Sequence, residues 1–435
     1  MRSVSRAATP QADDRAKFVI LLFSALTILG SYYAYDSIAP VADLLRDRRG
    51  FSQSQIGALN AVFSLPNIPL AIFGGVLIDR IGAARATLAA ATVSALGAIL
   101  TAVGEPYQLM LLGRLLFGLG HETLYIALLV GLAQAFHRGG SALAIALFFS
   151  TARVGSFAAD TSTSWARELY DKGWQPPLML AAALASTGVL TALVSLRIRR
   201  GMAELGTAVE RPAPISLRDL RGFGPSFWCI LWLNVIFASV FFTFRSTFSI
   251  EYFQDAKHIS RAAAGSANSW VFLAAIVATP ICGMIADRIG KRATLLAAGA
   301  ALMPLAYLLL ALTDAPIWVS TALMGTSFSV IPAVIWPSTA MLVAPRRIGT
   351  AFGLINMLQS TGLFVCNWAA GWLNDTAHAG PANPAGYVPM LGLLAGLAFV
   401  GLFAAILLQR YEAGQPGGGI EQPQPSIAEP GLAQA

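Results

Sequence analysis

The sequence predicts an all-α membrane protein of twelve transmembrane helices, arranged as two six-helix halves related by pseudo-symmetry. Of its 435 residues, 56% are hydrophobic and only 12% are charged. A soluble globular protein carries roughly 25% charged residues. In addition, a motif of about ten residues occurs once in each half, each time between two long apolar runs. A repeat on this scale indicates a duplicated helical bundle.

Each apolar run is close to the 20 residues that a hydrocarbon core of about 30 Å requires. Their succession places an N-terminal half at 17–196 and a C-terminal half at 227–410. We expect the spans at 17–42, 54–78, 86–104, 108–136, 141–167, 176–196, 227–250, 262–286, 293–313, 316–343, 349–374 and 386–410.

Three polar segments flank or separate these halves. Residues 1–16 are expected to form a cytoplasmic leader, and residues 411–435, rich in Gly, Pro and Gln, a disordered tail. Residues 197–226 contain six arginines and three prolines, which predicts a basic cytoplasmic linker between the halves. Within this linker, Ser216 could cap a short surface helix.

The distribution of basic residues predicts the orientation. With the N-terminus inside, nineteen of the 29 Lys and Arg residues lie in cytoplasmic segments and seven in external loops. This asymmetry follows the positive-inside rule and places both termini in the cytoplasm. The net charge of +7 is therefore assigned to topology and contact with membrane lipids, and no nucleic-acid partner is expected. Ala-rich, Arg-over-Lys composition suggests a bacterial chain in the plasma (inner) membrane, which we expect to be a monomer.

The repeated motif places a glycine four positions before an Asp-Arg pair and a second glycine three positions after the Asp, followed by basic residues. Acidic groups in such a loop can contact helix N-termini and basic side chains in one state and release them in another. We therefore expect a cytoplasmic latch, with a static turn as the alternative. The latch residues are Asp79, Arg80, Arg85, Asp287, Arg288 and Arg292.

Charged residues inside the predicted spans point to a binding site, because each costs about 2.5–3.5 kcal/mol at mid-bilayer. At a rise of ~1.5 Å per residue, Glu122 lies about 21 Å into the fourth span and Arg153 about 18 Å into the antiparallel fifth. Both depths are near the midplane. The two residues could form a salt bridge that pins the helices, or they could hold the two ends of a zwitterion. The charged residues inside the predicted spans that we consider are Arg114, Glu122, Arg153, Asp160 and Arg245.

The zwitterion hypothesis has a chemical basis. Arg presents a planar fork that donates two parallel hydrogen bonds to a carboxylate, and Glu accepts from an ammonium group. Tyr35, Arg245 and Asn356 are further candidates for substrate contact. The alternatives are packing for Tyr35, snorkelling to the outer interface or joining a gate for Arg245, and interhelical hydrogen bonding for Asn356. Asp160 is expected to pair with another charge near the outer mouth. Glu122, Asp160 and Arg114 are candidates for proton coupling, and for Arg114 the alternative is packing against backbone carbonyls.

The motif copies from Gly75 to Gly82 and from Gly283 to Gly290 resemble the loop between the second and third helices of major facilitator superfamily transporters. A narrower resemblance, to the family of lysosomal dipeptide transporters named major facilitator superfamily domain-containing protein 1, lies mainly in the N-terminal half. It is carried by the segments 32–36, 64–67, 73–80, 117–122 and 151–156. This resemblance implies a major facilitator fold, and it implies that Glu122 binds a peptide's amino end and Arg153 its carboxyl end.

The predicted function is alternating-access transport of small zwitterions, dipeptides first, by uniport or proton-linked transport. One alternative is a proton-coupled transporter of organic anions or drugs, and another is a non-transporting membrane sensor with the same fold. No enzyme is predicted: His121-Glu122 begins like a zinc-protease motif, but Tyr125 occupies the second His position. No cofactor or metal site is expected, and Cys229, Cys282 and Cys366 lie in spans as apolar thiols.

Overall fold

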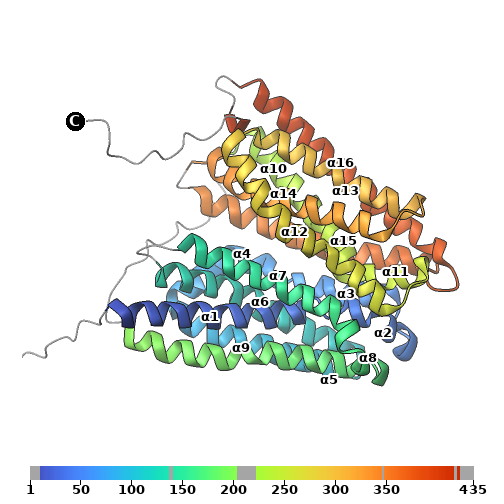
Figure 1. Ribbon diagram of the computed structural model, residues 1–435, viewed down its shortest axis with the longest axis horizontal. Coiled ribbons are helices and arrows are strands. Elements are labelled where there is room, and N and C mark those ends of the chain that lie inside the picture. The colour runs from blue at the N-terminus through green and yellow to red at the C-terminus, as the bar shows by residue number, and fades with distance from the viewer. Residues whose placement is uncertain (1–9, 137–140, 203–221, 345–346, 416–418, 422–435) are drawn as a thin grey trace, which may run out of the picture. The chain divides into compact units, whose positions relative to one another are not determined.

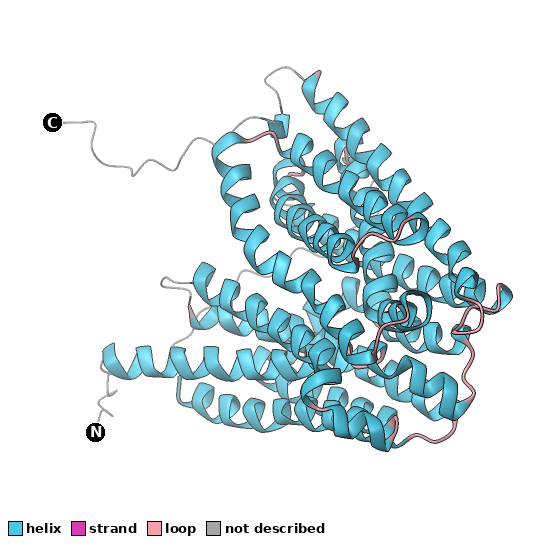
Figure 2. Cartoon of the chain, turned by 45° about the vertical axis from the view of Figure 1, so that its right-hand side comes forward, coloured by secondary structure: helices cyan, strands magenta, loops and turns pink. Residues whose placement is uncertain are grey.

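The computed structural model describes residues 10–136, 141–202, 222–344, 347–415 and 419–421. Regular structure in these residues is helical, and the β-structure there is a single isolated bridge between Gly380 and Asn383 (Figures 1 and 2). Eleven helices in the described part of the chain are long and apolar enough to cross a membrane. The all-α transmembrane fold predicted from the sequence is confirmed.

The chain forms two compact units that differ from the two predicted halves. The first unit contains residues 1–212 and also 243–269 and 363–387, and the second contains 213–242, 270–362 and 388–435. Two stretches from the C-terminal half of the sequence are therefore folded together with the N-terminal half. The contacts within each unit are described separately below.

In the first unit, α1 packs against α6, α7 and α9, while α5 packs against α6 and α9. The segment from α1 leads through a 3-10 turn into the short helix α2. The helices of the N-terminal half are α1 (Pro10–Tyr35), α2 (Ala42–Arg49), α3 (Gln53–Ser64), α4 (Asn67–Ile81), α5 (Ala83–Val103), α6 (Tyr107–Ala135), α7 (Ser141–Trp165), α8 (Arg167–Lys172) and α9 (Gln175–Met202). The remainder of this unit comprises η3 (Phe244–Phe248), α11 (Ser249–Lys257), the start of α12 (Arg261–Ile289), the end of α15 (Ile348–Thr376) and η5 (Pro384–Tyr387).

In the second unit, α13 packs between α14 and α16. Tyr307 of α13 donates a hydrogen bond to the carbonyl of Val240 (2.6 Å), which ties α13 to α10. The helices of this unit are α10 (Pro225–Thr243), the later part of α12, α13 (Arg292–Leu312), α14 (Ile317–Leu342), the first part of α15, α16 (Val388–Ala413) and the short turn η6 (Gly419–Glu421).

The second predicted span is a broken helix, which corrects the continuous span expected at 54–78. It consists of α3, with 12 residues, and α4, with 15 residues. Pro66 lies between them and has no N–H group to donate within a continuous helix. Each piece alone is shorter than the about 20 residues that a crossing requires, whereas the two together are long enough for one.

Two glycine positions let α5 and α6 approach closely. A Cβ atom on Gly97 would lie 2.2 Å from the backbone nitrogen of Phe117, and one on Gly120 would lie 2.3 Å from that of Ser94. Small residues at such crossings allow the van der Waals packing that holds helices together in a membrane. The sequence of this helix pair therefore permits backbone contact that any side chain would prevent.

The two copies of the repeated motif have the same local structure. Gly82 follows the end of α4 with φ of 83°, and Gly290 follows the end of α12 with φ of 73°. Both values lie in the left-handed region, where glycine has no steric penalty. The duplication seen in the sequence thus extends to the backbone of both loops.

The ends of the chain and the linker differ in part from expectation. Helix α1 begins at Pro10, within the predicted leader, and α9 continues to Met202, within the predicted linker. The expected surface helix at Ser216 lies outside the described residues. Residues 419–421 of the predicted disordered tail form η6, where the Glu421 carboxylate accepts a hydrogen bond from the Thr294 amide (2.9 Å) at the start of α13. That part of the tail is ordered because it caps a helix N-terminus.

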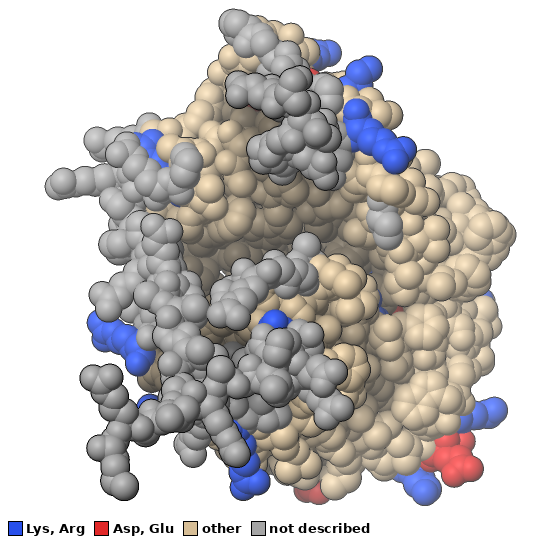
Figure 3. All heavy atoms as spheres, turned by 60° about the vertical axis from the view of Figure 1, so that its left-hand side comes forward, with Lys and Arg blue, Asp and Glu red and all other residues tan. Residues whose placement is uncertain are grey.

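The surface fits a membrane environment. In the space-filling view most of the visible described surface carries no charge, and Lys and Arg side chains stand near its margin (Figure 3). Large apolar side chains are exposed on transmembrane helices, among them Leu143 (66%) and Trp318 (57%). Exposed apolar surface of this extent is stable when lipid covers it.

Candidate functional site

Glu122 and Arg153, the central pair predicted from the sequence, both lie in the first unit. Glu122 is on α6, Arg153 is on α7, and both side chains are half-buried. Helix α1 packs against both of these helices. Among the described residues, no ion pair joins Glu122 to Arg153. The structure therefore does not contain the interhelical salt bridge that was the alternative interpretation.

Two tyrosines accompany this pair of charges. The Arg153 guanidinium lies 5.8 Å from the centre of the Tyr32 ring of α1, a cation–π distance. The phenol groups of Tyr32 and Tyr125 each interact electrostatically with both Glu122 and Arg153. Tyr32 thus stands near the positive and the negative group at once. The four side chains form what we call the charged site: Tyr32, Glu122, Tyr125 and Arg153.

Tyr35, a predicted substrate contact, lies beside this site in an aromatic cluster around His121. The His121 ring centre lies 5.0 Å from that of Tyr32, 5.8 Å from that of Tyr35 and 5.3 Å from that of Phe63. Its Nδ1 atom lies 2.7 Å from the Ser31 hydroxyl. His121 immediately precedes Glu122, so these contacts restrain the backbone that carries the carboxylate. Sequence reasoning tested His121 only as part of a zinc motif and did not identify this structural role.

Arg114 has the packing role that was its alternative assignment. It is 2% exposed, and its guanidinium donates to the carbonyls of Leu59, Ala34 and Tyr35, each at 3.3 Å. It also donates to the side chain of Asn60. These contacts use its donors to join α1, α3 and α6, which explains why a positive charge is tolerated there without a substrate.

Arg245 and Asp160 belong to one buried ion-pair group. Arg245 is 1% exposed and forms salt bridges with Asp36 and with Asp160, the latter at 2.6 Å. Asn268 donates to the other oxygen of Asp160 at 3.0 Å. The expected pairing of Asp160 with a charge is confirmed. The expectation that Arg245 snorkels is wrong, because its carboxylate partners lie inside the bundle; the sequence analysis did not single out Asp36.

A local irregularity presents Arg245 to these carboxylates. Residues Phe244–Phe248 form a π-helical turn between α10 and α11, where a continuous seventh span was expected at 227–250. A π turn rotates the following residues relative to an α-helix and is frequent at functional sites. Arg245 of this turn contacts Asp160 of α7, and the Asn60 amide of α3 donates to the Ser246 carbonyl of the same turn at 2.8 Å.

The remaining predicted site residues lie elsewhere. Asn356 is half-buried on α15 in the second unit. Of the latch residues, Arg80, Arg85 and Arg288 are exposed, and Arg292 is buried at 2% exposure. The side chains of Asp79 and Asp287 are outside the described residues. The latch therefore stays a prediction.

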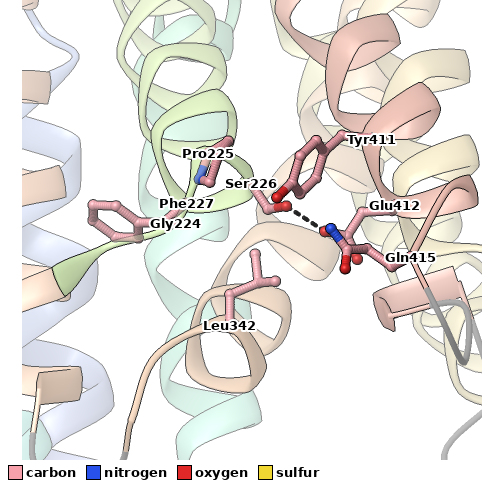
Figure 4. Close-up of a pocket in the computed structure, with 8 residues that line it drawn as sticks. All are labelled: Gly224, Pro225, Ser226, Phe227, Leu342, Tyr411, Glu412 and Gln415. Atoms are coloured by element: carbon pink, nitrogen blue, oxygen red, sulfur yellow. Dashed lines mark hydrogen bonds between the residues drawn. The ribbon is translucent and has the colours of Figure 1, made fainter.

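A pocket of about 280 Å³ lies in the second unit, at the ends of α10, α14 and α16 (Figure 4). Ser226 donates to the Glu412 carboxylate there, and the Ile420 amide donates to the other oxygen of Glu412 at 2.9 Å. None of the predicted substrate-binding residues lines it. Its one carboxylate is engaged in holding the tail, so the pocket is explained by tail attachment.

Comparisons with known proteins agree with this architecture. The profile of the family described as Major Facilitator Superfamily matches residues 22–255 and 230–432. The chain is 28% identical to the lysosomal dipeptide transporter MFSD1 of Bos taurus, over 83% of this chain and 80% of that protein. It is 27% identical to the MFSD1 of Danio rerio, over 92% of this chain and 88% of the relative. The resemblance stated from the sequence motifs is thereby confirmed.

Solved structures give the same fold at lower sequence identity. The crystal structure of the nucleoside transporter NupG has a TM-score of 0.74 and 13% identity, covering 91% of this chain and 99% of that one. A bacterial homologue of the human lysosomal transporter Spinster, in an inward-facing and unoccupied conformation, has a TM-score of 0.67 and 15% identity, covering 93% and 98%. At these identities the likeness concerns the fold alone.

Proposed function

The chain belongs to the Major Facilitator Superfamily, and on this premise we propose that it transports a small zwitterion, with a dipeptide as the first candidate, by alternating access. It is a multi-pass membrane transporter. The finer proposal, the substrate, is supported chiefly by one observation: a half-buried carboxylate and a half-buried guanidinium stand on the neighbouring helices α6 and α7, and Tyr32 of α1 lies near both.

The chemistry of the charged site suits both ends of a dipeptide. The Glu122 carboxylate would accept hydrogen bonds from the free ammonium group, and the Arg153 guanidinium would donate two to the free carboxylate. Tyr32 and Tyr125, near both charges, can supply hydroxyl groups and ring faces to the peptide between them. The similarity to proteins named dipeptide transporters supports the same assignment.

Transport needs more than binding. A ligand shifts an equilibrium between two conformations only through unequal affinity for them. We propose that both contacts are made together in one conformation, so that a ligand with only one charged end stabilises that conformation less. Uniport and proton-linked transport both remain compatible with this scheme. The proposed location is the plasma (inner) membrane, with both termini in the cytoplasm.

The test is thermal stabilisation of the purified protein by a panel of dipeptides, with N-acetylated and C-amidated dipeptides as controls. Free dipeptides are expected to raise the Tm, and blocking either end is expected to abolish the rise. Glu122→Gln and Arg153→Ala should each remove the response because each deletes one half of the recognition.

One result would contradict the dipeptide as the substrate, and another would contradict transport. Equal stabilisation by simple organic anions, with dependence on Arg153 but not on Glu122, would support the organic-anion transporter. Full two-ended recognition without flux into proteoliposomes would support the sensor. Flux of labelled dipeptide that is lost in both variants is the outcome that the proposal requires.

A further inference from the structure

A second group of charges lies at the end of the first unit that the topology predicts to be external, apart from the charged site. Arg46 of α2 forms salt bridges with Glu251 and with Asp255 of α11, the latter at 2.5 Å. Both carboxylates contact the same terminal nitrogen of the guanidinium. The Tyr387 hydroxyl donates to Asp255 at 2.7 Å, and the Gln53 amide donates to Glu251 at 2.8 Å. We call these five side chains the Arg46 cluster.

The charges of this cluster do not balance when every group is ionised. Glu251 and Asp255 carry two negative charges against the single positive charge of Arg46. The neighbouring Asp43 is already paired with Arg261 at 2.6 Å. Asp47, which also contacts Arg46, is 59% exposed and is therefore solvated by water. One carboxylate is thus in excess inside the protein.

The two carboxylates are not equivalent. Asp255 accepts from both terminal nitrogens of Arg46 and from Tyr387, so its charge is well satisfied. Glu251 is completely buried, and among the described residues its Oε2 atom has no hydrogen-bond partner. An ionised oxygen without a donor in a low-dielectric environment is far more costly than a neutral one. The excess negative charge is therefore neutralised most favourably by a proton on Glu251.

The comparison with the Arg245 group supports this distinction. There, too, two carboxylates share one guanidinium, but the second positive charge of Arg114 acts on Asp36 from α6. With Arg114 included, that group has two positive and two negative formal charges. The charged groups near Glu251 come from two helices: Arg46 and Asp43 lie on α2, and Asp255 lies on its own helix. Tyr387 from η5 also interacts with Glu251. Gln53 from α3 contributes only a neutral amide.

We propose that Glu251 binds a proton while the Arg46 cluster is assembled, and that disassembly of the cluster releases this proton. The ligand is thus a proton, held on Oε2 of Glu251. The cluster joins α2 and α3 of the N-terminal repeat to α11 and η5 of the C-terminal repeat. In this superfamily one repeat rocks against the other, so opening at this end separates Arg46 from both carboxylates and admits water to Glu251. The inference rests on the proposed function only in assuming alternating access and does not depend on the dipeptide site.

The direction of the pH effect follows from linkage. A conformation that holds one more proton is favoured as pH falls. The assembled, closed end is therefore favoured in acid, and the ratio of closed to open molecules changes by about tenfold per pH unit over the range in which the proton is exchanged. Glu251→Gln mimics the protonated carboxyl and should keep this end closed at every pH.

The first experiment is infrared spectroscopy of the full-length protein in liposomes without substrate, following the carbonyl stretch of protonated carboxyl groups near neutral pH. We expect a band that is lost in Glu251→Gln. It should also be lost in Asp255→Asn, because removing one carboxylate leaves Glu251 and Arg46 in balance. Asp375→Asn is the matched control, since Asp375 lies at the same end but accepts from the Gln53 and Ser54 amides at 2.7 and 2.8 Å. That variant should retain the band.

The second experiment measures the opening itself. Spin labels are attached at two exposed positions, Arg48→Cys on α2 and Ala263→Cys on α12, in a protein whose three native cysteines are replaced by alanine. Pulsed electron paramagnetic resonance then measures the distance between the labels, which reports the separation of the two repeats. The open population should rise with pH, and Glu251→Gln should abolish the rise. A band that persists in Glu251→Gln or in Asp255→Asn, or an opening whose pH dependence survives Glu251→Gln, would overturn the proposal whatever the dipeptide experiments show. Circular dichroism confirms that each variant is folded.

Discussion

Identical residue types have opposite roles in this protein according to the groups around them. Arg114 and Arg153 are both arginines inside predicted spans, yet Arg114 is almost completely buried among carbonyl acceptors and Arg153 is half-buried over a tyrosine ring. In the first arrangement the donors of the guanidinium hold the helices together, and in the second the guanidinium belongs to the site that we propose for the substrate. The depth of a charged residue in its span therefore indicates that some interaction must stabilise the charge. It does not tell whether that interaction is structural or made with a ligand.

This difference predicts the stability of two substitutions. Arg114→Ala should lower the free energy of unfolding by about 3 kcal/mol or more, because each buried carbonyl left without a donor costs about 1–3 kcal/mol. Arg153→Ala should cost less than about 1 kcal/mol, because its surroundings are partly exposed. Thermal denaturation of the two purified variants against the parent protein tests this, and equal losses would show that Arg153 is structural as well.

At the scale of helices, two predicted spans depart from a regular α-helix. The break at Pro66 divides the second span, and the π turn at Phe244–Phe248 carries Arg245 to its two carboxylates. Regular elements, in contrast, pack by the close approach of small residues, as α5 and α6 do at Gly97. Both features follow from the absence of water in the membrane, where packing and internal hydrogen bonds hold helices together.

Two glycine substitutions separate the effect of helix packing on stability from the effect of helix propensity. Gly97→Ala should destabilise the protein by about 1–3 kcal/mol or more, because its Cβ atom would lie 2.2 Å from the Phe117 nitrogen and the helices must separate. Gly396→Ala on α16 meets nothing within 4 Å and should be neutral or slightly stabilising, since alanine is the better helix former. Unfolding of both variants in the same detergent measures the difference. A harmless Gly97→Ala would refute the close packing of α5 and α6.

At the scale of the whole molecule, the compact units cross the boundary between the repeats. The segments 243–269 and 363–387 belong to the C-terminal repeat in sequence and to the first unit in space. Their contacts with the N-terminal repeat include polar ones, through Arg46, Asp43, Asp36 and the Asp375 carboxylate that caps α3. Polar contacts that water can replace are suited to an end that opens and closes.

The orientation of the molecule is itself testable. Alkaline phosphatase inserted after Ala382, in a predicted external loop, should be active in a bacterial host, whereas insertion after Val209, in the predicted cytoplasmic linker, should leave it inactive. The reason is the excess of Lys and Arg in the segments assigned to the cytoplasm. The reverse pattern of activity would invert the topology and would place the Arg46 cluster at the cytoplasmic end.

Much of the fold, and the choice of candidate site residues, came from sequence because the signals are local. Hydropathy predicts the spans, the duplicated motif predicts two repeats, and the rise per residue brings Glu122 and Arg153 to a common depth. The depth argument, however, could not decide between a salt bridge and a binding site. That choice depends on rotamers and on the position of α1, which brings Tyr32 to Arg153.

By itself, then, the sequence determined the membrane class and the duplicated helical architecture, and it led to the prediction of two central charges. Only the tertiary structure decided which charges pair. Asp36, Asp160 and Arg245 come from three distant segments, and Arg46 and Glu251 come from two. Glu421 caps a helix that begins more than a hundred residues earlier. The physical reason is that a charge in a low-dielectric interior is stabilised by whichever opposite charge or dipole the packing brings within a few ångströms. The local spacing of residues in the sequence does not encode this proximity.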